Sequence, residues 1–90
     1  MRKLERAVVK PVDKWAKEHK VISLIIDYAG WPDRCYLFPD GTHIYIEFKR
    51  PNKKPRELQK VRLRTLVEYG QLAYYSDNAN EAIGLLEQYL

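Results

Sequence analysis

Glu47 and Lys49 are the residues whose types and spacing first suggest chemistry. They lie in residues 42–49, where Ile44, Ile46 and Phe48 alternate with other side chains. Neighbours on a β-strand point to opposite faces, and residues two apart share a face. One face of this strand is therefore apolar, and the other presents a carboxylate beside an ammonium group. A surface ion pair gives the same pattern, so the pair alone does not define a site.

Asp33 supplies a second carboxylate. It follows Gly30-Trp31-Pro32 and precedes a strand expected at residues 34–38. A hairpin joining that strand to residues 42–49 would bring Asp33 near Glu47 across the sheet. Carboxylate oxygens are hard ligands that suit Mg²⁺ or Mn²⁺, and such an ion can hold a phosphodiester and lower the pKa of an attacking water. Lys49 could then position that water or offset developing negative charge.

The remaining pattern predicts the elements that position these residues. Leu4, Val8, Val12 and Trp15 recur at helical spacing, so residues 3–19 are expected to form an amphipathic helix that Pro11 kinks or divides. The apolar, β-branched residues 21–27 indicate a first strand. Pro39-Asp40-Gly41 is a turn sequence between the two hairpin strands.

The second half of the chain predicts two further helices and a strand. Residues 57–69 contain strong helix formers and end at Gly70, a suitable residue after a helix. Residues 71–76 read as a strand, and Asn78 precedes Glu81 in a capping arrangement that opens a last helix to Leu90. We therefore expect one α/β domain over residues 1–90, in the order α-β-β-β-α-β-α, with a mixed sheet flanked by helices.

The positive charge is concentrated in one segment. The net charge is +4, but residues 50–64 hold seven basic residues and one acid, Glu57, and so have a local charge of +6. Such a segment suits a polyanion such as DNA, because each neutralised phosphate releases counterions. A solvated helix face is the alternative interpretation.

Cysteine usage and hydropathy favour a cytoplasmic location. Cys35 is the only cysteine, so no intrachain disulfide can form, and we expect a reducing compartment. The first residues are interrupted by charges and Pro11, unlike a secretory signal. A chain of 90 residues buries a small core, and dimerisation would add buried area. His19 and His43 lack the spacing of a zinc pair.

Several motifs taken together resemble the VRR-Nuc branch of the PD-(D/E)XK nuclease superfamily. They are Gly30-Trp31-Pro32-Asp33-Arg34, Glu47-Phe48-Lys49-Arg50, Gln59 and Gly70. The resemblance spans nearly the whole chain, and the family core has the order α-β-β-β-α-β. The glycine that often precedes the glutamine helix in the family is absent, and Pro51-Asn52-Lys53-Lys54-Pro55 replaces it.

The resemblance implies a set of site residues. Asp33 and Glu47 correspond to metal ligands, the backbone carbonyl of Phe48 completes the coordination, and Lys49 is the catalytic lysine. Glu5 matches a first-helix glutamate that points to the metal site, although helical geometry leaves it equally free to face solvent. Gln59 would be an active-site residue, against the alternative of a helix-end amide in water. DNA phosphates are expected to contact Arg50, Lys53, Lys54, Arg56 and Lys60.

Aromatic residues around these motifs are assigned no catalytic role. Trp31 is expected to pack over the hairpin as core rather than stack on a distorted base. Tyr45 shares the face of Glu47, whereas Tyr74 and Tyr75 are expected to pack around the last strand.

The sequence therefore predicts a metal-dependent endodeoxyribonuclease using Mg²⁺ or Mn²⁺. Stand-alone VRR-Nuc domains of this size resemble viral or phage proteins, acting in the host cytoplasm as homodimers on branched DNA such as four-way (Holliday) junctions. A symmetric dimer would present two cutting sites to a two-fold symmetric junction. The alternatives are an endonuclease for ordinary duplex or single strands, and a nucleic-acid-binding module that retains the fold without turnover.

Overall fold

The chain forms the predicted sequence of helices and strands. The structure is a computed structural model that describes residues 3–90, with side chains from Glu5 onward. The elements are α1 (Lys3–Glu18), β1 (Ile22–Ile25), β2 (Arg34–Leu37), β3 (His43–Phe48), α2 (Glu57–Glu68), β4 (Leu72–Ser76) and α3 (Ala79–Glu87). The expected order α-β-β-β-α-β-α and the α/β fold class are confirmed. No helix in the described part of the chain has the length and apolar character needed to cross a membrane.

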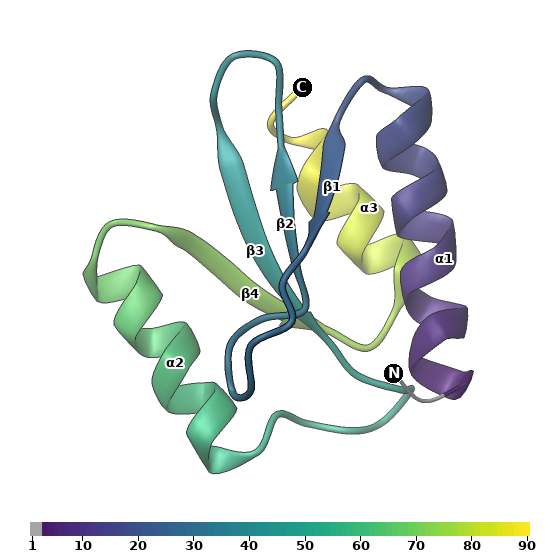
Figure 1. The fold of residues 1–90 in the computed structure, drawn as a ribbon. Helices are drawn as coiled ribbons and strands as arrows, with labels where there is room; N and C mark the ends of the chain where they lie inside the picture. The colour runs from purple at the N-terminus through teal and green to yellow at the C-terminus, as the bar shows by residue number, and fades with distance from the viewer. Residues whose placement is uncertain (1–2) are drawn as a thin grey trace.

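The strands form one mixed sheet in the order β1-β2-β3-β4. The pairs β1–β2 and β2–β3 are antiparallel, and β3–β4 is parallel. Parallel neighbours need a crossover connection, which α2 provides between β3 and β4. Helices α1 and α3 lie together beside the sheet, and α2 stands apart from them next to β4 (Figure 1).

The turn between β2 and β3 fixes the register on which the site depends. Gly41 has φ +93°, and the side chain of Asp40 accepts a hydrogen bond of 2.9 Å from the Thr42 backbone N–H. These are the features predicted from Pro39-Asp40-Gly41, since glycine adopts positive φ without steric cost. The resulting register places Arg34 opposite Ile46. Asp33, one residue earlier, is thereby brought level with the end of β3.

The core lies between the sheet and the pair α1 and α3. Ile44, Ile46 and Phe48 on β3 are almost fully covered, as the strand alternation predicted. They pack in one cluster with residues of both helices, including the predicted Val8, Val12 and Trp15. The side chain of Leu4, also predicted in this stripe, lies outside the described residues. We call this side of the sheet the core face.

Of the two effects predicted for Pro11, a kink or a division of the first helix, the division does not occur. Helix α1 runs without interruption from Lys3 to Glu18 and includes Pro11. Proline removes one backbone hydrogen bond from a helix and frees the carbonyl four residues earlier. Both Pro11 and Ala7 lie on the exposed side of α1, where water can satisfy that carbonyl. Burial of the opposite side holds the helix together.

The other side of the sheet, which bears Tyr45 and Glu47, is only partly covered, and we call it the open face. Helix α2 packs against β4 but has no buried residue. Leu63 and Leu66 are half-buried, whereas Val67 is 56% exposed. A helix with so little burial leaves apolar surface without a covering layer.

Candidate functional site

Asp33 is held against the end of β3 by a backbone hydrogen bond. Its Oδ2 accepts from the Phe48 backbone N–H over 2.8 Å. Its own carbonyl accepts from the Ile26 N–H over 2.9 Å, so both its side chain and its backbone are tied to neighbouring segments. Phe48 stands between Glu47 and Lys49 in the sequence. The predicted meeting of Asp33 with this motif is therefore what the hairpin produces.

Glu47 is a buried carboxylate on the open face. Its exposed fraction is 3%, although most of that face is uncovered. One oxygen, Oε2, lies 3.5 Å from Nζ of Lys49. The other, Oε1, is fully covered and has no hydrogen-bond partner among the described residues. A buried carboxylate oxygen without a partner is costly, and either a proton on Glu47 or a bound cation would relieve that cost.

The surroundings of Glu47 favour its protonated form. Burial is the main cause, the neighbouring Asp33 carboxylate adds to it and Lys49 opposes it, and together they raise the pKa of Glu47 to about 8. Ionising both of two close carboxylates away from water costs free energy, because the two negative charges repel each other. A cation between them would favour the charged form of both, so binding of a cation is coupled to loss of the Glu47 proton.

Glu5 lies near Asp33 and Lys49. Its half-buried side chain lines one surface hollow with Asp33 and Arg34, and a second hollow with Lys49. The N-terminal end of α1 approaches the loop that follows β3 (Figure 1). This location agrees with a role at the site. Glu5 is not fully exposed to solvent, which was the alternative.

Four of the five predicted DNA-binding residues gather next to Lys49. A hollow of about 250 Å³ is lined by Glu5, Lys49, Arg50, Lys53, Lys54 and Arg56. The Pro51–Pro55 loop thus brings its two lysines next to Lys49. Asn52 within this loop has φ +67°, and its N–H donates to the Asp77 carboxylate over 3.0 Å.

Lys60 and Gln59 lie at the start of α2. Lys60 pairs with Glu57 on the same helix at 3.2 Å and does not line the hollow. Gln59 is half-buried, and its side-chain oxygen accepts from the Arg56 backbone N–H over 2.8 Å. This contact caps the helix, so its active-site role remains a prediction.

Trp31 packs against α2 instead of forming part of the core. The Arg62 guanidinium lies 4.8 Å from the ring centroid, a cation–π distance. Gly30 before it has φ +85° and approaches Leu58 so closely that a Cβ would lie 3.0 Å from its Cδ2. The loop bearing Asp33 is therefore docked on α2.

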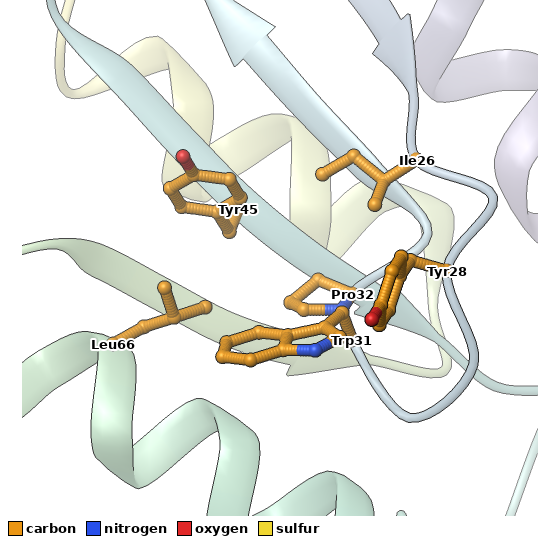
Figure 2. A pocket seen from close by; sticks show the side chains of 6 residues that line it. All are labelled: Ile26, Tyr28, Trp31, Pro32, Tyr45 and Leu66. Atoms are coloured by element: carbon orange, nitrogen blue, oxygen red, sulfur yellow. The ribbon is translucent and has the colours of Figure 1, made fainter.

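An apolar groove of about 520 Å³ opens beside this loop. It is lined by Ile26, Tyr28, Trp31, Pro32, Tyr45 and Leu66. Figure 2 shows the Trp31 ring between Leu66 of α2 and Tyr28. Tyr45 shares the open face with Glu47, so the groove borders the carboxylate site.

Tyr75 is a neighbour of the site that the sequence pattern did not identify. It is paired with Glu47 across β3 and β4 and is 46% exposed, whereas it was expected to pack around the strand. Tyr74 does pack against the core cluster, and its hydroxyl lies 3.4 Å from that of Tyr89. Strand alternation around Ala73 could have separated the two tyrosines, but the parallel register with β3 could not be read from sequence.

The carboxylates could hold a metal ion only with help from other ligands. Within the described residues, no group of three or more His, Cys, Asp or Glu side chains is arranged to bind a metal. Mg²⁺ commonly uses one or two carboxylates and completes its shell with water and substrate phosphate. Asp33, the partnerless Oε1 of Glu47 and the Phe48 carbonyl fit that kind of open site.

The fold is similar to that of solved structures described as VRR_NUC domains. The sequence itself matches no family model and no curated protein. A structure described as "VRR_NUC domain" superposes with a TM-score of 0.88 at 20% identity, covering 99% of this chain and 100% of that chain. A "VRR_NUC domain protein" superposes with a TM-score of 0.79 at 20% identity, covering 100% and 90%. The chain therefore has the fold of these VRR_NUC domain structures, as the resemblance implied.

Proposed function

We propose that the chain is a divalent-metal-dependent endonuclease that hydrolyses DNA phosphodiester bonds. The observation on which this rests most heavily is Glu47, a buried carboxylate with one oxygen left without a partner, fixed between Asp33 and Lys49. A structural ion pair would pair both oxygens or face water. The nuclease fold of the similar structures supports the same reading.

Asp33, Glu47 and the Phe48 carbonyl would hold Mg²⁺ or Mn²⁺, with Glu5 close enough to contribute. When bound, the ion supplies charge stabilisation on the phosphate and lowers the pKa of the attacking water. The protein fixes the positions of the Asp33 and Glu47 carboxylates. The Phe48 N–H fixes the Asp33 carboxylate, and the buried strand β3 fixes Glu47.

Lys49 is the residue that would act directly on the reacting groups. Its side chain is 13% exposed and lies on the open face beside Glu47. An ammonium held there can donate to a non-bridging phosphate oxygen or to the attacking water, so it stabilises charge that develops during hydrolysis. Gln59 at the start of α2 is proposed as a further active-site contact.

Phosphates flanking the cut bond would bind the basic residues around the hollow. Lys53 and Lys54 are exposed, and with Arg50 and Arg56 they surround Lys49. Such contacts give affinity without reading bases. Lys60, outside the hollow, would contact the backbone further along the DNA.

A homodimer is supported by the apolar surface of the open face. Ile22 and Leu24 pair with Leu37 and Cys35, and Cys35 pairs with Tyr45, so all lie on the face of Glu47. Ile22 and Leu24 are 54% and 45% exposed, and Tyr28 at the groove is 70% exposed. A second copy would cover this face with the same surface of its own, as two-fold symmetry requires.

Such a dimer suits branched DNA, including four-way junctions. Two sites related by a two-fold axis match the symmetry of a junction, and a domain of this size has little surface for reading sequence. The lone Cys35 is buried and unpaired, in keeping with a cytoplasmic setting, that of the host cell if the protein is viral.

The test compares cleavage of a synthetic four-way junction and a matched linear duplex, with Mg²⁺ or Mn²⁺. We expect metal-dependent cuts with preference for the junction. Equal rates on both substrates would point to a general endonuclease. Tight binding without cutting would point to a silent binding module.

A further inference from the structure

A polar cluster on the core face joins three elements behind the carboxylate site. Asp13 of α1 accepts hydrogen bonds at Oδ1 from the Ser23 hydroxyl at 2.7 Å and the Tyr36 hydroxyl at 2.8 Å. Its Oδ2 faces Arg34 Nε at 3.4 Å. Burial and the Asp13 charge raise the pKa of Tyr36, so its hydroxyl remains a donor. One carboxylate thus links α1, β1 and β2.

Arg34 extends this cluster to Asp33. Its Nη1 donates to the Asp33 carbonyl over 3.3 Å, and the Ile26 N–H donates to the same oxygen over 2.9 Å. The Arg34 side chain is only 13% exposed, so it has little freedom to turn away. Arg34 and Ile26 therefore hold the backbone carbonyl of Asp33, while the Phe48 N–H holds its carboxylate.

Arg34 is also a potential competitor for the site. It lines the same hollow of about 330 Å³ as Glu5 and Asp33. Without the negative charge of Asp13, the guanidinium would be attracted to the Asp33 and Glu5 carboxylates. An arginine paired with those carboxylates would oppose the binding of a cation there.

We propose that Asp13 is a positioning residue for the metal site, which acts by holding Arg34 on the Asp33 backbone and away from the Asp33 carboxylate. The inference rests on the proposed function. It assigns a role to a residue that does not itself touch the reacting groups.

Asp13→Asn is the informative change, because it keeps an acceptor for Ser23 and Tyr36 but removes the charge that holds Arg34. Groups that orient metal ligands typically affect metal affinity on the order of 10- to 100-fold, so we expect a weakening of about tenfold or more in Mn²⁺ affinity, measured by calorimetry without DNA. Cleavage should recover at saturating Mn²⁺. Glu87→Gln, at an exposed position of α3, is the charge-matched control.

A merely structural role is separated by a double-mutant cycle and by urea unfolding of each variant. If Asp13 acts through Arg34, Asp13→Asn should change Mn²⁺ affinity less than about twofold in the Arg34→Gln background. The same loss of affinity in both backgrounds, or no loss beyond that of Glu87→Gln, overturns the proposal. If Asp13→Asn does not fold, Asp13→Gln, which also removes the charge and keeps an amide acceptor one methylene further out, takes its place in the cycle with the same expected results.

Failure of the proposed function gives a different result. A native chain that binds no Mn²⁺ contradicts the metal-dependent nuclease and the role of Asp13 together. A native chain that binds Mn²⁺, with affinity insensitive to Asp13, contradicts only the role of Asp13.

Discussion

The carboxylate of Asp33 accepts a hydrogen bond of 2.8 Å from the backbone N–H of Phe48, the residue between Glu47 and Lys49. This contact joins the loop before β2 to the end of β3 at the point where the two acids meet. Because the donor is a backbone N–H, no second side chain is needed to fix this oxygen of Asp33. The geometry of the site thus depends on the hairpin register as much as on the side chains themselves.

The raised pKa of Glu47 predicts that Glu47→Gln stabilises the metal-free protein relative to the native chain. The size of this stabilisation should increase as pH rises. The native pKa of about 8 lies above the ordinary value of 4.5, so folding favours the protonated form. That stabilisation is complete below about pH 4.5 and is lost as pH rises through 8. The stability difference between variant and native chain should grow by up to about 1.4 kcal/mol per pH unit, measured by urea unfolding. A difference independent of pH between 5 and 9, as expected for Glu87→Gln, would argue against it.

Lys49→Met should separate metal binding from cleavage. The ammonium is not expected to ligate the metal, so Mn²⁺ affinity should be largely kept. Loss of charge stabilisation in the transition state should reduce the rate of cleavage by about 10²- to 10³-fold. Calorimetry and single-turnover cleavage measure the two effects. Equal loss of metal affinity and rate would show instead that Lys49 supports the metal site.

Replacing Lys53 and Lys54 by alanine should weaken DNA binding in a salt-dependent way. If each lysine neutralises one phosphate, the slope of log affinity against log salt should fall by about 2. Fluorescence anisotropy at several salt concentrations gives the slope. Lys14 and Lys17 on the exposed side of α1 form the matched control pair. An unchanged slope for the Lys53 and Lys54 variant contradicts their assignment as phosphate contacts.

Leu24→Asp should dissociate the proposed dimer. A charge on the open face would be buried without a partner when a second copy covers it. Analytical ultracentrifugation should show a weakening of dimerisation by more than about tenfold, the equivalent of about 1.4 kcal/mol. Ile25→Asp, on the core side of the same strand and 72% exposed, should have little effect. A native chain that is monomeric at high concentration rules out the dimer directly.

The sequence predicted the fold well where local signals were strong. Alternation around Ile44 and Ile46, the turn at Gly41 and the Asn78 cap all correspond to observed features, with Asn78 accepting from the Glu81 N–H at 2.9 Å. Pro11 does not divide α1, because the breaking effect of proline is local, whereas the burial that holds α1 together comes from distant strands. Trp31 was misplaced because the sequence of its loop does not show which helix the loop packs against.

The meeting of the two carboxylates was predictable from the sequence, but the contacts that support them were not. Asp33 and Glu47 could be brought together by hairpin geometry alone. The Asp13 cluster could not, since it joins α1 to two strands through side chains far apart in sequence. One signal was present: Arg34 and Tyr36 share the core face by alternation, and a cation there needs an acid from a covering helix.

The most direct test of the central claim is strand cleavage of the four-way junction by the native chain, Asp33→Asn and Glu47→Gln, with Mn²⁺ and with the metal chelated. Asn at position 33 can still accept from Phe48, so the fold should persist. The account predicts that the native chain cleaves only with metal. It also predicts that the cleavage rate falls by more than about a hundredfold in each variant, which exceeds the usual effect of losing a residue that only hydrogen-bonds to a metal ligand. Metal-independent cleavage, or variants as active as the native chain, would contradict it.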